Sequence, residues 1–77
     1  MKRYNFGGET IASVGYNAQY AVLEVEFVKE GTIWQYLNVP EEIWYRFKSE
    51  SYPDLFFHQN IKGRFDEKQI GRIRVEG

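Results

Sequence analysis

The aromatic pair Trp34 and Tyr36 is the first feature of the sequence whose residue types and spacing could carry chemistry. The two residues lie two positions apart in a segment typical of a strand, so both rings should project from one face of a sheet. Exposed rings in this arrangement stack successive bases in several sheet-based nucleic-acid modules. The structural alternative is that both rings pack in the core, beneath the helix predicted to follow this strand.

The segment from His58 to Arg64 is the second such feature. It combines an imidazole, an amide and two cations, and Gly63 within it permits close approach of the backbone to a ligand. These groups could hold a phosphate or the edge of a base. Alternatively, the segment ends a helix, with Asn60 bonded to the backbone and Lys62 complementing the helix dipole. The candidate binding residues for a nucleic acid or a nucleotide are therefore Trp34, Tyr36, His58, Asn60, Lys62 and Arg64.

Neither catalysis nor a metal centre is indicated by the residue pattern. The chain has no cysteine and one histidine, which excludes cysteine-ligated zinc, thiol catalysis and a histidine-rich metal site. The sequence has no glycine-rich phosphate loop and no nucleophile elbow. Glu24 and Glu26 alternate with apolar residues, so we expect them on the solvated face of a strand rather than in a catalytic carboxylate pair. We therefore predict a non-catalytic protein without a cofactor.

Composition favours one small domain. The chain has 77 residues, of which 43% are hydrophobic and 27% charged, so neither disorder nor a membrane span is indicated. A basic start without an apolar region behind it is not a secretory signal, and a cytoplasmic protein is the expectation. The net charge is −1, with basic ends and an acidic middle, which disfavours general binding to duplex nucleic acid.

Hydrophobic periodicity predicts an antiparallel meander of three strands. Apolar and polar residues alternate most clearly in Ala21–Val28, and shorter strand patterns occupy Ile11–Tyr16 and Thr32–Leu37. The connections, at residues 17–19 and 29–31, are too short for any arrangement other than antiparallel neighbours.

Two short helices should follow the meander. The first begins at Pro40, with Asn38 as its cap, because proline is favoured in the first turn of a helix. The second runs from Pro53 to about Gln59, and Gly63 should end this segment by adopting a left-handed conformation.

The two ends of the chain also alternate apolar with polar residues. Tyr4 and Phe6, and residues 70–75, could each add a strand to the meander or pair with another copy of the chain. The predicted fold class is α+β: a three-stranded antiparallel meander followed by two short helices, with an optional extra terminal strand. Leu55 should be one of the buried members of the second helix. The rest of the predicted core is Val14, Leu23, Val25, Phe27, Val39, Ile43, Phe47, Phe56 and Ile61.

Residues 10–65 resemble the KTSC domain. The resemblance is carried by IASVGY at Ile11–Tyr16, by an aromatic pair followed by Val39-Pro40, and by NIKGRF at Asn60–Phe65. The family is named after the C-terminal domain of certain bacterial lysyl-tRNA synthetases, and it also occurs as small free-standing proteins, including in phages. We therefore expect residues 1–77 to form a single KTSC-like domain with short extensions on either side of the family core.

The central motif of this family is usually Tyr-x-Tyr, whereas this chain has Trp34-Gln35-Tyr36. An aromatic ring at the first position can still stack or pack, but any role of the first tyrosine's hydroxyl is lost with tryptophan. The resemblance implies a proposed role in RNA binding. We accordingly predict a module that binds RNA or a nucleotide through aromatic and basic residues. The alternatives are a phage-type oligomer that sequesters a small nucleotide signal, and a protein–protein interaction module.

Self-association is a further expectation from size. A core of about 56 residues buries only roughly 60% of the surface of its unfolded chain and is marginal alone. Pairing of the terminal segments, within one chain or between two, would cover the open edges of the meander. We expect a homo-oligomer, with a twofold dimer favoured.

Overall fold

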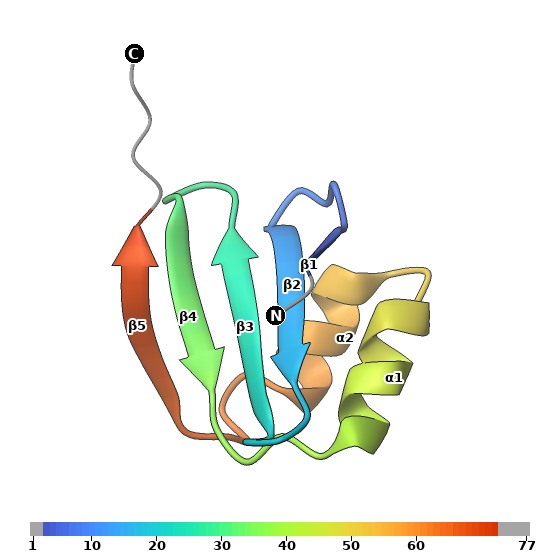
Figure 1. The fold of residues 1–77 in the computed structure, drawn as a ribbon. Helices are drawn as coiled ribbons and strands as arrows, with labels where there is room; N and C mark the ends of the chain where they lie inside the picture. Colours follow the sequence, from blue (N-terminus) through green and yellow to red (C-terminus); the bar gives the residue numbers. More distant parts are fainter. Residues whose placement is uncertain (1–2, 73–77) are drawn as a thin grey trace.

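The computed structural model describes residues 3–72, and their central part is the meander that the sequence predicts (Figure 1). β2 (Ile11–Asn17), β3 (Val22–Phe27) and β4 (Thr32–Tyr36) pair antiparallel in sequence order. In β3 the alternation has its expected effect, because the central apolar residues are buried and the two glutamates point to the other face.

The turns between these strands follow from their residue types. The side chain of Asn17 accepts hydrogen bonds from the backbone N–H groups of Gln19 at 3.0 Å and Tyr20 at 3.3 Å, which closes the first turn. Gly31 closes the second turn with a φ of 62°, a conformation in which glycine has no steric cost. The short turns fix the register of the three strands.

Two further strands extend the meander, so the prediction of three strands with one optional addition is wrong in number. β1 (Arg3–Asn5) pairs with β2, and β5 (Glu67–Arg72) pairs with β4, giving an antiparallel sheet in the order β1-β2-β3-β4-β5. Both added strands belong to this chain. Each pairs with backbone N–H and C=O groups that an edge strand of the meander would otherwise leave unpaired. The predicted strand at 70–75 begins earlier, at Glu67, and residues 73–75 lie outside the described residues. Self-association through the outer strands stays a prediction.

The two helices begin at the expected prolines but are capped differently. α1 (Glu41–Ser49) has Pro40 at its N-cap, and no side chain caps it. The expected cap Asn38 instead has a φ of 60°, so its left-handed backbone turns the chain out of β4. α2 (Pro53–Asn60) begins at Pro53, and Gly63 beyond it has the predicted left-handed conformation, with a φ of 80°.

Within the described residues, no helix has both the length and the apolar composition that crossing a membrane requires.

The two helices lie on one face of the sheet (Figure 1), and aromatic rings join them to it. α1 covers the first two strands, since Trp44 meets Tyr4 of β1 and stacks on Tyr16 of β2, each at 5.5 Å between ring centroids. α2 covers the next two strands through Phe57, which meets rings of both β3 and β4. Offset and edge-to-face pairs of this kind are the favoured geometries for buried rings.

Most of the predicted core is buried, but one residue of α2 was assigned to the wrong face of the helix. The exceptions are Phe27 and Ile43, which are only half-buried, and Leu55, which is 55% exposed. Phe57 takes the inward position instead: it is 1% exposed, next to the buried Phe56. The predicted residues that are buried are Val14, Leu23, Val25, Val39, Phe47, Phe56 and Ile61.

Adjacent residues of α2 should therefore differ sharply in their contribution to stability. Replacing Phe56 with alanine should lower the free energy of unfolding by about 3–5 kcal/mol, because the ring is buried and leaves a cavity. Replacing Leu55 with alanine should change it by less than about 0.5 kcal/mol. Urea unfolding followed by tryptophan fluorescence measures both. Equal losses in the two variants would show that the buried face of α2 is wrongly assigned.

Candidate functional site

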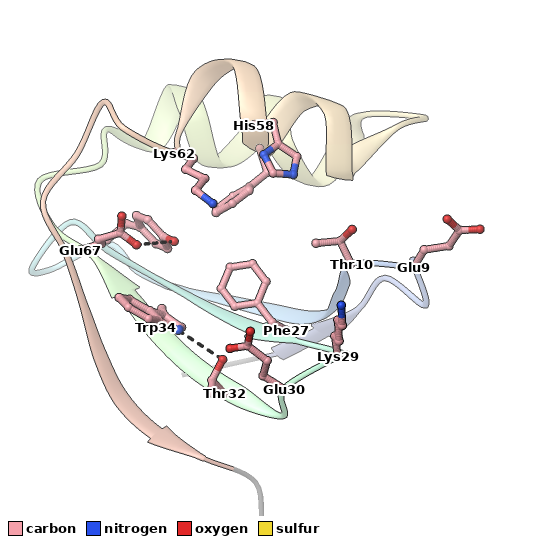
Figure 2. A pocket seen from close by; sticks show the side chains of 12 residues that line it. Glu9, Thr10, Phe27, Lys29, Glu30, Thr32, Trp34, His58, Lys62 and Glu67 are labelled. Atoms are coloured by element: carbon pink, nitrogen blue, oxygen red, sulfur yellow. Dashed lines mark hydrogen bonds between the residues drawn. The ribbon is translucent and has the colours of Figure 1, made fainter.

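A pocket of about 680 Å³ lies between α2 and the strands β3, β4 and β5 (Figure 2). It forms because α2 covers the sheet only as far as β4, while β5 continues the sheet beyond the helix layer (Figure 1). The volume is within the range of roughly 300–1,000 Å³ that is usual for small-molecule sites. The pocket is lined by Glu9, Thr10, Phe27, Lys29, Glu30, Thr32, Trp34, Tyr36, Phe57, His58, Lys62 and Glu67.

The two rings of the predicted aromatic pair have different environments. Tyr36 is 1% exposed and packs edge-on against Phe57 at 5.3 Å, so it belongs to the core, beneath α2 rather than the predicted α1. Trp34 is half-buried and lines the pocket, and its indole Nε1–H donates to the Oγ1 of buried Thr32 at 3.2 Å. The pair is therefore not an open platform for two bases. It supplies one ring, held in place, to a pocket that is open to solvent on one side.

Tyr36 also fixes a carboxylate at the pocket. Its hydroxyl donates a hydrogen bond to Oε2 of Glu67, on β5, at 3.1 Å (Figure 2). Burial, the charge of Glu67 and this hydrogen bond together raise the pKa of Tyr36 far above its ordinary value. The hydroxyl therefore stays protonated and remains a donor at any ordinary pH. Glu67 was not predicted as a site residue, because only its pairing with Tyr36 across the sheet brings it to the pocket.

Charged groups of both signs surround the rings. The lining carries the ammonium groups of Lys29 and Lys62 and the carboxylates of Glu9, Glu30 and Glu67. None of them forms an ion pair with another described residue, since the ion pair within residues 3–72 joins Arg3 to Glu24. In Figure 2, Lys62 is directed into the pocket from the end of α2, and His58 lies on the helix above it. The pocket thus presents both ammonium donors and carboxylate acceptors, of which Oε2 of Glu67 already accepts from Tyr36.

Four of the six predicted binding residues meet at this pocket, namely Trp34, Tyr36, His58 and Lys62. The other two, Asn60 and Arg64, bond to carbonyls of α2, which the structural alternative for this segment proposes for Asn60. Asn60 donates from Nδ2 to the backbone carbonyl of Phe56 at 3.2 Å. Arg64 donates from Nε to the carbonyl of Gln59 at 3.0 Å. Helix carbonyls without an intrahelical partner attract donors of this kind.

Sequence reasoning missed the contributions of the two loops. Lys29 and Glu30 were assigned only to a turn, and Glu9 and Thr10 lie in the connection before β2. Asp54, at the start of α2, holds that connection, because its Oδ2 accepts a hydrogen bond from the backbone N–H of Thr10 at 3.2 Å. No local pattern in the sequence indicates contacts between segments so far apart.

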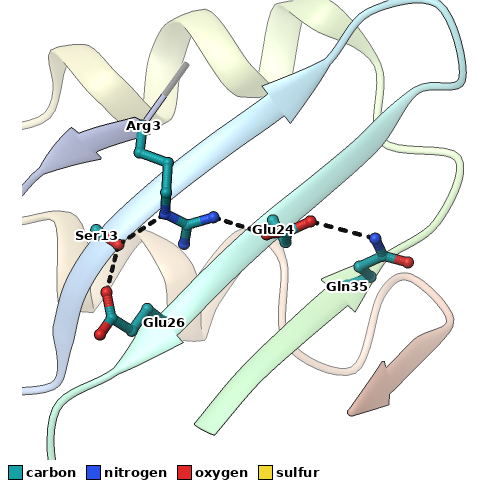
Figure 3. A network of polar contacts seen from close by, with 5 residues as sticks. All are labelled: Arg3, Ser13, Glu24, Glu26 and Gln35. Carbon is teal, nitrogen blue, oxygen red and sulfur yellow. Dashed lines mark hydrogen bonds and ion pairs between the residues drawn. The ribbon is translucent and has the colours of Figure 1, made fainter. Parts of the chain in front are cut away.

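The opposite face of the sheet carries a polar network rather than a solvated row of glutamates (Figure 3). Arg3 forms an ion pair with Glu24 at 2.7 Å and donates from Nε to Ser13 at 3.1 Å. The Ser13 hydroxyl donates to Glu26 at 2.6 Å. Gln35 donates to the second oxygen of Glu24 at 3.3 Å. The expectation of solvated glutamates is thus wrong, since β1 brings Arg3 across β2 and both glutamates are half-buried.

The role of this network is structural. It ties together β1, β2, β3 and β4 on the face away from the helices (Figure 3). In residues 3–72, no group of three histidine, cysteine or acidic side chains is placed to hold a metal ion.

The five-stranded sheet with two helices on one face defines a small α+β domain. The family model of the KTSC domain matches residues 9–65, and the chain therefore belongs to the KTSC domain family. The structure is similar to the crystal structure of a KTSC domain protein from Yersinia pestis, with a TM-score of 0.86. That protein is 36% identical, and the alignment covers 91% of this chain and 97% of that one. Among curated proteins, none matches the chain.

The buried hydroxyl of Tyr36 predicts a pH dependence of stability. Because its pKa is raised in the folded state, the unfolded chain loses this proton near pH 10.0 while the folded chain still binds it. Stability is therefore complete below that pH and falls as pH rises above it. In this range, Tyr36→Phe should make the slope of unfolding free energy against pH shallower, by the amount that corresponds to about one bound proton. Urea unfolding at several pH values above 9 measures the slope, and an unchanged slope would contradict the assignment.

Proposed function

We propose that this KTSC domain is a non-catalytic binding module that holds one nucleotide unit, either free or unpaired within an RNA, in the pocket between α2 and the sheet. The observation that carries the proposal is the combination of a fixed indole, Trp34, with unpaired cations in a cavity of about 680 Å³. The two forms of ligand share the same chemistry, and the experiment below separates them.

The base would stack on Trp34. Stacking on an aromatic side chain contributes roughly 1–3 kcal/mol per base and needs a ring with one accessible face. The hydrogen bond from the indole to Thr32 holds the ring in place before a ligand arrives, so little side-chain freedom is lost on binding. Phe27 and Phe57 complete the apolar walls of the pocket.

The phosphate would be held by the ammonium groups of Lys29 and Lys62. Both line the pocket without an ion pair to another described residue, so no internal contact has to break when an anion binds. Three carboxylates also line the site, and they limit the negative charge that it can accept. These charges favour a monophosphate, or a single phosphate of an RNA strand, over a triphosphate.

Binding of one unit is favoured over the readout of successive bases. The second ring of the expected platform, Tyr36, is 1% exposed and cannot offer its face to a neighbouring base. Binding is also favoured over catalysis. The lining histidine, His58, forms no hydrogen bond with the lining hydroxyl of Thr10, whereas an activated nucleophile would need a base within reach.

Substitution of the indole should test the proposed site directly. In titration calorimetry with nucleoside monophosphates, Trp34→Ala should weaken binding by about 10- to 100-fold, because the stacking surface is removed. Trp34→Phe should retain most of the affinity. Tyr52→Ala serves as the matched control, since this ring is 74% exposed and does not line the pocket. Circular dichroism confirms that each variant is folded.

Short single-stranded RNA is titrated in parallel at low and at physiological salt. One phosphate contact should give a shallow salt dependence, with a slope of roughly −0.7 in log affinity against log salt. Tighter binding of the RNA than of the monophosphates identifies RNA as the source of the nucleotide, and the reverse order identifies a free nucleotide. Absence of binding by both at low salt would refute the proposed function.

A further inference from the structure

We infer that the pocket selects guanine, with the carboxylate of Glu67 accepting hydrogen bonds from the N1–H and N2–H₂ groups of a base stacked on Trp34. The inference rests on the proposed function and adds to it the identity of the base. It comes from the charges of the pocket, from the position of Glu67 in the sheet and from the hydrogen bond that orients its carboxylate.

The excess of carboxylates needs an explanation in a site proposed for an anionic ligand. The described lining has three carboxylates against two ammonium groups, and none of the five forms an ion pair with another described residue. A carboxylate accepts hydrogen bonds and repels other acceptors. A ligand that fits must therefore present donors to at least one carboxylate while its phosphate meets the lysines.

Guanine alone among the four common RNA bases presents two adjacent donors on one edge. Adenine offers one amino group between ring nitrogens that accept hydrogen bonds, and cytosine offers one amino group beside an acceptor. In uracil the single N–H lies between two carbonyl oxygens. Each of these three edges would bring at least one acceptor toward the carboxylate, whereas guanine can satisfy both carboxylate oxygens.

The register of the sheet brings Glu67 beside the indole. On β5, Glu67 pairs with Tyr36 and Gln69 pairs with Trp34, so Glu67 flanks the position opposite the indole. Both Glu67 and Trp34 line the pocket, and Figure 2 shows them on the same side of it. The carboxylate thus lies at the edge of a base stacked on the ring, where hydrogen-bonding groups of the base are found.

The Tyr36 hydroxyl orients this carboxylate before the ligand binds. It occupies one lone pair of Oε2 at 3.1 Å, and the described residues leave Oε1 without a hydrogen bond. A carboxylate has about four acceptor positions and the hydroxyl takes one, so each oxygen can still accept one of two parallel donors from a base. Lys29 lies on the opposite side of the pocket from Glu67 in Figure 2, which leaves room for the sugar and phosphate to extend toward a cation.

Calorimetry of the full chain with GMP, IMP, AMP, CMP and UMP tests the inference. GMP should bind about 10- to 100-fold more tightly than AMP, as expected for a good bidentate contact to a base. IMP lacks the 2-amino group and should fall between them. Glu67→Gln should reduce the affinity for GMP toward that for AMP, because an amide offers one acceptor and one donor where two acceptors are needed. The glutamine still accepts from Tyr36, so the variant should stay folded.

The matched control is Glu42→Gln, which removes the same charge from an exposed position of α1 outside the pocket and should leave the preference for GMP intact. Oligonucleotides that differ in a single unpaired G or A extend the comparison to RNA. Equal affinities for GMP and AMP, unchanged in Glu67→Gln, would overturn the inference and leave the proposed function standing. Failure of all nucleotides and oligonucleotides to bind would overturn both. Binding of an organic amine such as agmatine in place of any nucleotide would overturn both as well.

Discussion

The packing of Phe57 is the contact on which the rest of the structure depends. This ring is 1% exposed and meets Phe27 of β3 and Tyr36 of β4 edge-on, at 5.5 Å and 5.3 Å between centroids. It also stacks on Phe47 of α1, so one side chain joins both helices to the sheet. Without this ring α2 would lose its aromatic contact with β4. The pocket between α2 and the sheet would also lose one of its apolar walls. In a domain this small, a few large rings must supply most of the buried area.

Tyr36 links this core to the pocket. Its ring belongs to the core, while its hydroxyl reaches Glu67 on the strand that the C-terminal part of the chain adds to the sheet. The family match ends at residue 65, so β5 and Glu67 lie beyond the matched residues. The family core thus supplies Trp34, and the added strand supplies a carboxylate near it.

The sequence predicted those elements that depend on local pattern. The alternation in β3, the prolines before both helices and the glycine after α2 led to the correct meander, the correct helices and the correct end of the helical segment. The pattern failed where pairing across the sheet decides. β5 was assigned too late because Ile70 is the single apolar residue of Glu67–Arg72, so no hydrophobic alternation marks the start of the strand. β1 is three residues long, which is too short for periodicity to show.

The candidate site could likewise be predicted only in part, because local pattern indicates residue types but not how distant segments meet. Residue type and spacing were sufficient to find Trp34, Tyr36, His58 and Lys62, which meet at the pocket. They could not show that α2 covers Tyr36 and leaves Trp34 accessible, because exposure depends on where the helix ends over the sheet. Nor could they separate Lys62 from Asn60 and Arg64, whose side chains bind helix carbonyls instead. The pocket's glutamates come from three separate segments and have no shared motif.

The most direct test of the account is the response of the two indole N–H groups to a nucleotide. Two-dimensional ¹H–¹⁵N NMR of the full chain measures this response during titration with GMP. Trp34 lines the pocket, whereas Trp44 of α1 is buried against Tyr16 of β2 and serves as an internal control. The account predicts a saturable shift of the Trp34 signal, with the Trp44 signal unchanged. A Trp34 signal that does not move at saturating nucleotide, or a shift confined to Trp44, would contradict it.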